Sequence, residues 1–357
     1  MRMVLLFWPC PKSARTPTEP FYTAALSARA RVLGIDFSAL PLPPAASYAA
    51  ALWPKRRPDV FYDRTFPCPG PGSRALSAAR RSWISRLRAA GDLRLNAGLP
   101  DKWRQFTLWM RDPELRAHLP AQTLFTAPEA LWRLDRPAVV LKPRAGAFGR
   151  GVIAVDLRPP YAVLGRDGHN RPFVRRFEHQ EALLQFLRPY LGRAIVQEKL
   201  SLSSSIGTPF DVRVLVQWRA GKDGEEDQQV YDYVRLGVPG GLTANLKGGG
   251  TAVRLETAAR RLRRPDLLGM RQAIHRLAQR AAEALAAAFP PQIEMGMDFG
   301  VDRDGRLWLL EANGKPGRMG LLGAHGRETF DASLDALLLT ARARWHRTMR
   351  RKKANLR

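Results

Sequence analysis

The sequence predicts an α+β fold built from two or three layered lobes. The chain of 357 residues exceeds a single ordinary domain. Its apolar fraction of 45% is sufficient for a large core. Strand-like and helix-like segments are mixed along the chain and several strands pair into hairpins, which disfavours a purely parallel sheet.

The first lobe is expected over residues 1–98 as an α/β unit. Its predicted elements are strands over 4–8 and 59–62 and helices over 22–33 and 76–89. Cys10 and Cys68 form neither a metal-binding nor a redox spacing. We expect them to be unpaired thiols in a reducing cytoplasm.

A central lobe is expected over 99–197 and a third lobe over 198–347, followed by a basic tail at 348–357. The central lobe has predicted helices over 102–111, from 128 onward and over 179–188, strands over 139–142, 152–155 and 194–197, and a hairpin over 158–177. The third lobe has a predicted hairpin of strands 211–218 and 229–236, a long helix over 266–288 and a final helix over 329–344.

A hairpin near the C-terminal end is the strongest candidate for chemistry. Asp304-Gly305 is typical of a two-residue type I′ turn, and centring the hairpin there places Asp298 opposite Glu311. Alternation then places on the face of Asp298 the side chains of Leu307, Leu309, Glu311 and Asn313. Two carboxylates about 5 Å apart repel by roughly 3 kcal/mol at an effective dielectric near 20. A divalent cation removes this repulsion, and oxygen ligands without His or Cys favour Mg²⁺. The alternative is a solvated acidic face, which the two leucines disfavour.

A glycine-rich loop follows the predicted strand that ends at Lys142. Gly146, Gly149 and Gly151 would let backbone N–H groups approach a phosphate, while Lys142 supplies a positive charge. The pattern is not a Walker A motif, because the loop leads into a strand. Taken alone, it favours an ordinary hairpin turn. The downstream magnesium hairpin favours the phosphate loop, since Mg²⁺ and phosphate binding occur together in nucleotide chemistry.

Two further segments carry polar side chains at strand ends. Glu198, Lys199 and Leu200 close a buried strand between lobes, where backbone groups and one carboxylate can meet an adenine amino group. A solvated strand end fits these residues equally well. Asp211 and Arg213 lie one pleat apart on one face, which in isolation indicates a surface ion pair.

The formal net charge of +26 is spread along the chain and is dense near its end. Such a charge suits nucleic acid, an anionic surface or an acidic substrate. No zinc-finger, helix-turn-helix or aromatic RNA-binding signature accompanies it, so nucleic acid is not expected as a specific partner. No apolar run reaches the roughly 18 residues of a membrane span. We therefore expect a cytoplasmic protein.

In order and spacing these segments resemble the ATP-grasp superfamily over roughly 100–320. The matching positions are Lys102, Lys142 with its glycine loop, Gln197 to Leu200, Asp211 to Arg213, Asn245 to Lys247, and Asp298 with Glu311 and Asn313. The interval from Asp298 to Asn313 is similar to that of RimK-like ligases, which glutamylate proteins. The stretches 57–64 and 311–316 are more similar to the endospore-coat-associated YheC/YheD group.

The resemblance implies an ATP-grasp fold, in which two α+β lobes hold the nucleotide, preceded by an N-terminal α/β domain. It implies ATP and two Mg²⁺ as ligands. The implied phosphate contacts are Lys102, Lys142, Asn245 and Lys247. The implied adenine contacts are Glu198, Lys199 and Leu200. Asp211 would lie near the ribose or orient Arg213, Arg213 would stabilise the transferring phosphoryl group, and the metal ligands would be Asp298, Glu311 and Asn313. Thr243 stands where RimK-like enzymes usually carry Arg, which disfavours a glutamate ligase.

The activity implied by this resemblance is ATP-dependent ligation of a carboxylate to an amine through an acyl-phosphate. Closure of the loop 146–151 over ATP would exclude water. The alternatives are a spore-associated ATP-binding protein with little catalysis, in the forespore or spore coat, and a kinase acting on a hydroxyl. The basic surface favours an acidic peptide or polymer as substrate, and an amino acid is the other candidate. Arg318 and the loop 314–326 are candidate substrate contacts. A homodimer is common in this superfamily, and the sequence leaves the oligomeric state open.

Overall fold

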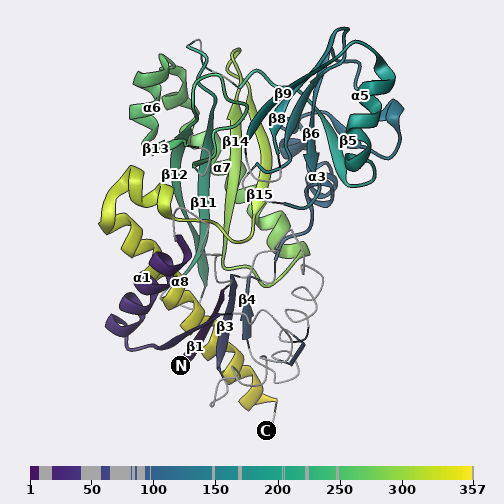
Figure 1. Cartoon of the computed structure of the whole chain (residues 1–357). Coiled ribbons are helices and arrows are strands. Elements are labelled where there is room, and N and C mark those ends of the chain that lie inside the picture. Colours follow the sequence, from purple (N-terminus) through teal and green to yellow (C-terminus); the bar gives the residue numbers. More distant parts are fainter. Residues whose placement is uncertain are drawn as a thin grey trace.

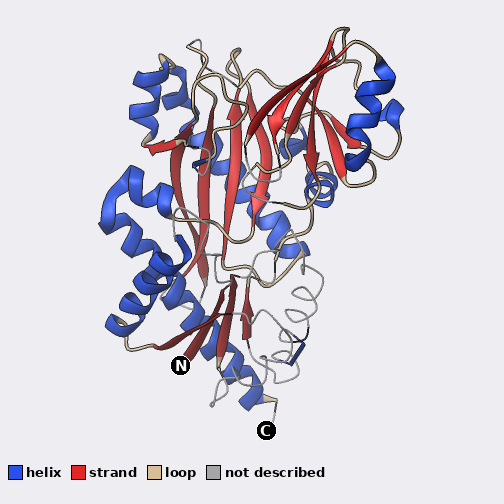
Figure 2. Ribbon diagram, viewed as in Figure 1, coloured by secondary structure: helices blue, strands red, loops and turns tan. Residues whose placement is uncertain are grey.

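In the computed structural model the described residues form three β-sheets, each with helices packed against it (Figures 1 and 2). The residues that it describes are 1–7, 18–41, 58–64, 82, 85–86, 93–96, 98–146, 149–167, 171–202, 204, 206–221, 225–246 and 249–355. Trp8, Cys10, Cys68 and nearly all of the predicted helix 76–89 lie outside them.

The N-terminal sheet is parallel, with the strand order β2 (Asp36–Pro41), β1 (Arg2–Phe7), β3 (Val60–Arg64) and β4 (Leu93–Leu95). Helix α1 (Thr18–Val32) shares a buried core with this sheet, in which Leu26 packs with Leu5. The two predicted strands and the helix at 22–33 are confirmed apart from their ends. The sequence analysis missed β2 and β4, of which β4 spans only three residues.

The central sheet is antiparallel and has its own core. Its strand order is β5 (Gln122–Leu124), β10 (Ala194–Glu198), β6 (Ala138–Pro143), β7 (Ile153–Asp156), β8 (Tyr161–Arg166) and β9 (Pro172–Phe177). Helix α5 (Gln180–Leu187) and the 3₁₀ turns η2 (Pro128–Leu131) and η3 (Arg188–Tyr190) complete this lobe. The helix predicted from 128 is only η2, because Asp135 adopts a positive φ of 48° and Pro137 cannot continue a helix.

The C-terminal sheet carries the long hairpins. Its strand order is β13 (Thr251–Val253), β12 (Glu226–Leu236), β11 (Phe210–Ala220), β14 (Glu294–Val301) and β15 (Leu307–Asn313). One face packs on α6 (Leu255–Leu262), α7 (Asp266–Ala288), α3 (Lys102–Trp109) and α4 (Pro113–Arg116). The Trp109 indole donates to the carbonyl of Ala281 at 3.2 Å. The stretch before the central sheet therefore packs into the core of the C-terminal sheet.

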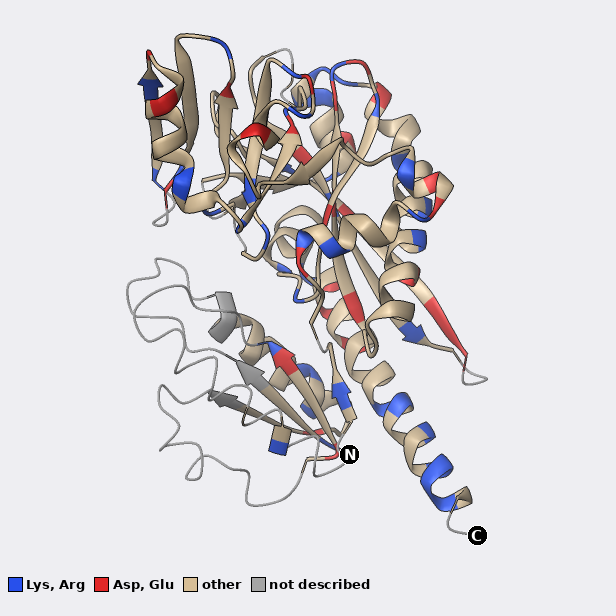
Figure 3. Cartoon of the chain, turned by 90° about the vertical axis from the view of Figure 1, so that its right-hand side faces the viewer, with Lys and Arg blue, Asp and Glu red and all other residues tan. Residues whose placement is uncertain are grey.

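Helix α8 (Met319–Ala354) lies against both the N-terminal and the C-terminal sheets. It is longer than the predicted helix at 329–344, and it bends at Gly326, whose φ is 82°. Gly320 and Gly323 weaken the helical signal of its first turns. Its basic last turns extend past the sheets (Figure 3). No helix in the described part of the chain is long and apolar enough to cross a membrane.

The β14–β15 hairpin differs from its prediction in two ways that cancel. Gly305 has a φ of 81°, but Asp304 does not share the positive φ that a type I′ turn needs. The turn is a wider loop closed by Asp302, which donates to the Arg306 carbonyl at 3.0 Å. This shifts the pairing by one residue, so that Phe299 lies opposite Leu309.

A register shift beyond that pair restores the predicted partnership of Asp298 with Glu311. Leu310 is the extra residue of this β-bulge. The bulge also corrects the predicted faces. Leu307 and Leu309 lie in the core, whereas Asp298 and Glu311 line a pocket on the opposite face.

Candidate active site

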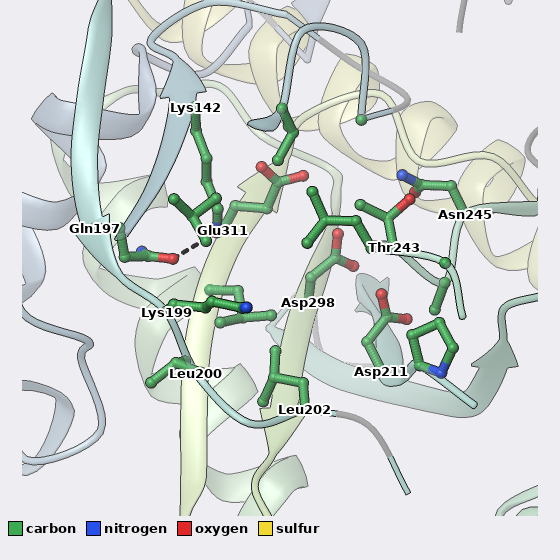
Figure 4. Close-up of a pocket in the computed structure, with 18 of the residues that line it drawn as sticks. Lys142, Gln197, Lys199, Leu200, Leu202, Asp211, Thr243, Asn245, Asp298 and Glu311 are labelled. Carbon is green, nitrogen blue, oxygen red and sulfur yellow. Dashed lines mark hydrogen bonds between the residues drawn. The ribbon is translucent and has the colours of Figure 1, made fainter. Parts of the chain in front are cut away.

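A pocket of about 350 Å³ lies between the central and C-terminal sheets. Figure 4 shows Gln197, Lys199 and Leu200 on one side of it, with Asp211 and Asn245 on the other. The predicted site residues that line it are Lys102, Lys142, Gly146, Gly149, Glu198, Lys199, Leu200, Asp211, Asn245, Asp298 and Glu311. Gly151, Arg213 and Asn313 are outside this lining, and Lys247 lies outside the described residues.

The hairpin brings oxygen-bearing side chains together at one end of the pocket. The Asn313 amide nitrogen lies 3.4 Å from Oδ2 of Asp298 and 3.3 Å from Oε1 of Glu311. Lys102, at the start of α3, pairs with Glu311 at 3.3 Å and donates to the Gly146 carbonyl at 3.4 Å. No group of three or more His, Cys, Asp or Glu within the described residues could hold a metal ion. The third polar group beside the two carboxylates is the Asn313 amide, which turns its nitrogen toward them.

Two arginines hold Asp298 from neighbouring strands. Arg213 on β11 is its direct cross-strand partner and binds both carboxylate oxygens, with the Nη2–Oδ2 bond at 2.9 Å. Arg235 on β12 lies 3.1 Å from the same Oδ2 and binds Asp211 at 2.5 and 2.7 Å. Burial would raise the pKa of Asp298, but Arg213 and Arg235 outweigh it and the pKa lies below its ordinary value. Burial raises the pKa of Asp211, against the opposing effect of Arg235.

The sequence analysis missed Arg235, although a signal for it exists. Asp211 and Arg235 are directly opposite in the β11–β12 ladder, and both line the pocket. Drawing the predicted hairpin in register would have placed a basic side chain beside Asp211. Arg213, in contrast, lies behind Asp298. Its Nη1 is 3.0 Å from the position that a Cβ would occupy at Gly296, so that glycine provides its space.

Lys142 projects into the pocket from β6 and is held by an amide. Its ammonium donates to Oε1 of Gln197 at 2.6 Å, and Nε2 of Gln197 donates to Oε1 of Gln122 at 2.9 Å. Burial lowers the pKa of Lys142 to about 8, with Glu311 opposing this shift and Lys102 adding to it. The Lys142 side chain is therefore partly neutral at neutral to alkaline pH. An anion bound beside it would favour its protonated form, which indicates an anion-binding site.

Described residues of the loop after Lys142 line the pocket and meet the C-terminal lobe. Gly149 has a φ of 69°, and a Cβ there would lie 2.3 Å from Nδ2 of Asn245. At the base of the loop, Arg144 pairs with Asp101 at 2.8 Å. The described part of the loop therefore approaches Asn245 at a distance that only glycine permits at position 149.

Glu198 does not direct its carboxylate to the pocket interior. One oxygen accepts from the backbone N–H of Ala121 at 2.8 Å and the other binds Arg136 at 3.2 Å. The Glu198 N–H in turn donates to the Ala121 carbonyl at 2.9 Å. These bonds join the two chain segments that enter and leave the central lobe.

Arg318 is not a substrate contact, which corrects the prediction from sequence. It is buried between the N-terminal and C-terminal sheets and pairs with the fully buried Glu294. Tyr22 and Tyr62 of the N-terminal lobe bind the same pair. An Arg that follows a glycine-rich loop looks exposed in a sequence, because its long-range partners are not visible there.

The fold and this pocket define the ATP-grasp class: two antiparallel α+β sheets face each other across a cationic and acidic cleft, behind a parallel N-terminal sheet. Residues 91–343 match the YheC/D-like ATP-grasp family, and the chain belongs to it.

Two similar proteins come from Bacillus subtilis (strain 168). The chain is 26% identical over 325 residues to the endospore coat-associated protein YheC, covering 85% of this chain and 87% of YheC. It is 24% identical over 269 residues to the endospore coat-associated protein YheD, covering 73% of this chain and 57% of YheD.

Two solved structures of ligases share the fold. The ATP-grasp ligase PsnB, complexed with a minimal precursor, Mg and ADP, has a TM-score of 0.53 at 16% identity, covering 95% of this chain and 98% of PsnB. D-alanine–D-alanine ligase from Bacillus anthracis has a TM-score of 0.52 at 10% identity, covering 99% of each chain. At these identities the likeness shows the fold alone.

Proposed function

We propose that the chain is a Mg-ATP-dependent ligase that joins a carboxylate to an amine through an acyl-phosphate. The observation that carries this proposal is the convergence of two lysine ammonium groups with Asp298 and Glu311 in one pocket between two sheets, where Asn313 bonds both carboxylates from beside the lining. A cationic wall suits a polyphosphate, and an oxygen-only donor set suits Mg²⁺.

The donor set fits a hard divalent cation. Asp298 and Glu311 supply carboxylate oxygens that the Asn313 NH₂ group bridges, and Asn313 would present its oxygen to the cation by turning its amide over. When bound, Mg²⁺ would neutralise charge that develops on the transferring phosphate. Arg213 and Arg235 fix the Asp298 carboxylate and keep it ionised, since they lower its pKa.

The pocket side chains have separate tasks in this proposal. Lys102 and Lys142 bind phosphate oxygens, and Lys142 exchanges its bond to Gln197 for one to the nucleotide. Arg235 faces the pocket and stabilises the transferring group, while Arg213 positions Asp298 from behind. The loop around Gly149 excludes water and so protects the reactive anhydride.

The reaction balances without a protein nucleophile. A substrate carboxylate oxygen attacks the γ-phosphorus, the bond to the ADP oxygen breaks, and an acyl-phosphate forms. A neutral amine then attacks the acyl carbon, the phosphate leaves with the former C–O electron pair, and the amine loses one proton. The products are an amide, ADP and inorganic phosphate.

The decisive experiment is to measure phosphate release from Mg-ATP in the presence of single amino acids and acidic peptides. Peptides are included because a solved structure of PsnB is complexed with a precursor peptide. Mass spectrometry of the product separates ligation, which removes one water, from phosphorylation of a hydroxyl. Glu311→Gln keeps the shape of the side chain and removes a charge, so turnover should fall at least about a hundredfold. Glu283→Gln, on an exposed face of α7, is the matched control.

Turnover that survives Glu311→Gln would exclude this mechanism. Nucleotide binding without any product across the panel would instead support an ATP-binding protein with little catalysis. We also propose, from the names of the two relatives, that the chain acts during spore formation, which imaging of a fluorescent fusion in sporulating cells would test.

A further inference from the structure

Strand β15 carries Glu311 and Asn313, and among the described residues it is the outermost strand of the C-terminal sheet. An edge strand leaves the backbone N–H and C=O of every second residue without a strand partner. Ala312 lies between the two oxygen-bearing residues and is only 6% exposed. Its backbone groups are too buried to rely on bulk water and need partners of another kind.

Gln105 on helix α3 supplies both partners. Its Oε1 accepts from the Ala312 N–H at 2.9 Å, and its Nε2 donates to the Ala312 carbonyl at 3.1 Å. The same Nε2 donates to the Pro100 carbonyl at 2.9 Å, so one N–H and two carbonyl groups determine the orientation of the amide. Gln105 is 4% exposed. Its side chain therefore takes the place of a neighbouring strand at this one residue.

Helix α3 also contacts the side chain of Glu311. Lys102 lies three residues before Gln105, on the same face of the helix, and pairs with Glu311 at 3.3 Å. The start of the helix is fixed in turn, because Asp101 caps it and pairs with Arg144 at the base of the glycine loop. Helix α3 therefore holds a side chain and the next backbone unit of β15 together.

The bulge at Leu310 explains why the strand needs this support. Without it, the register of the preceding pairs would place Glu311 opposite Met297, in the core. With it, Glu311 lies opposite Asp298. A bulge disrupts the hydrogen-bond ladder locally, so the hairpin alone specifies the position of the following residues weakly. The two hydrogen bonds from Gln105 fix the shifted register just after the bulge.

We propose that Gln105 is a positioning residue: by holding the backbone of Ala312, it aligns the two oxygen-bearing side chains of β15 for a divalent cation. The inference deepens the proposed function and rests on it, because the cation is part of that function. Gln105 is outside the pocket lining, so it acts through β15 and touches neither cation nor nucleotide. Removal of groups that orient metal ligands from behind typically weakens metal binding tenfold to a hundredfold.

The test measures how far Mn²⁺ strengthens the binding of a non-hydrolysable ATP analogue, by titration calorimetry with saturating Mn²⁺ and with EDTA. Mn²⁺ replaces Mg²⁺ because both prefer oxygen ligands. Wild type should bind the analogue at least about a hundredfold more tightly with Mn²⁺. Gln105→Met keeps an unbranched side chain of similar length but removes the hydrogen bonds, so this ratio should fall at least about tenfold. Affinity in EDTA should stay within about threefold of wild type, because both pocket lysines remain.

Gln292→Met is the matched control. Gln292 is 2% exposed, and its amide donates to the carbonyl groups of Phe289 at 2.6 Å and Gly98 at 3.3 Å. Its replacement therefore also removes buried hydrogen bonds to the backbone, but none of them to β15. The control should lower the urea midpoint of unfolding about as much as Gln105→Met, while the Mn²⁺ ratio stays within about twofold of wild type.

Gln105→Asn keeps the amide but is one methylene shorter and does not reach Ala312, so it should show the same fall as Gln105→Met. A Mn²⁺ ratio that is unchanged in either Gln105 variant overturns the assignment, as does an equal fall in Gln292→Met. If wild type binds no nucleotide, or if Mn²⁺ does not strengthen that binding, the proposed function fails instead. The two failures are therefore distinguishable.

Discussion

Nucleotide binding should take up a proton at Lys142. Burial lowers the pKa of this ammonium to about 8, from an ordinary value of 10.5. About half of the Lys142 side chains are therefore neutral at pH 8, about a tenth at pH 7 and about nine tenths at pH 9. A triphosphate beside the ammonium favours its charged form and returns the pKa toward the ordinary value.

The sign and size of the effect follow from linkage. Binding should take up about half a proton at pH 8, rising to about 0.9 at pH 9, because the bound state is protonated throughout. Affinity should therefore weaken as the pH rises through 8, by about tenfold between pH 7 and pH 9. Phosphate groups are already ionised over most of this range and do not cancel the effect.

The assay is titration calorimetry at pH 8 in buffers with different ionisation enthalpies, which counts the protons exchanged. Lys142→Arg is the control, because a guanidinium stays charged at all of these pH values. Lys142→Arg should take up no proton when the nucleotide binds, and its affinity for the nucleotide should not change with pH. Equal proton uptake in wild type and Lys142→Arg would refute the reasoning, as would affinity that rises with pH.

Two further predictions concern the loop at Gly149 and the buried ion pair of Arg318 with Glu294. Gly149→Ala should weaken nucleotide binding at least tenfold, because the new Cβ would meet Asn245. Gly34 has a similar positive φ but open space around it, so Gly34→Ala is the control. This control should lower only the free energy of unfolding, by about 1 kcal/mol. Equal affinities of the two variants, measured by calorimetry, would contradict this. Arg318→Met should lower the free energy of unfolding in urea by about 3–5 kcal/mol, because it removes the nearest charge partner of the fully buried Glu294 and leaves only Arg64, at 3.8 Å. Adding Glu294→Gln should recover part of that loss, and a single-variant loss below about 1 kcal/mol would show that the pair is not needed.

Local patterns in the sequence predicted that Asp298 pairs with Glu311, but the turn and the register that bring them together differ from the predicted ones. Asp298 does lie opposite Glu311, although the turn is wider than a type I′ turn and a bulge at Leu310 restores the register. A pattern of alternating residues cannot reveal a bulge, so the faces of Leu307 and Leu309 were wrong.

The residues that the sequence analysis missed or misread have partners that lie far from them in the sequence. Arg235 became a site residue only through its pairing with Asp211, which depends on the register of an eleven-residue hairpin. Arg318 was misread because its partner Glu294 is known only once the strands are placed. Glycine loops and acidic hairpins are local signals, whereas ion pairs across sheets are not.

The buried pair of Arg318 and Glu294 also determines which part of the protein can open. It ties the N-terminal lobe to the strand that leads to Asp298, so these two lobes should turn as one rigid body. The six-stranded lobe should then rotate as a separate rigid body. Its hinge would be the place where Ala121 and Glu198 are hydrogen-bonded to each other. Substrates would then enter from the side of the Gly149 loop, and a cross-link between that loop and the opposite wall would trap whatever is inside.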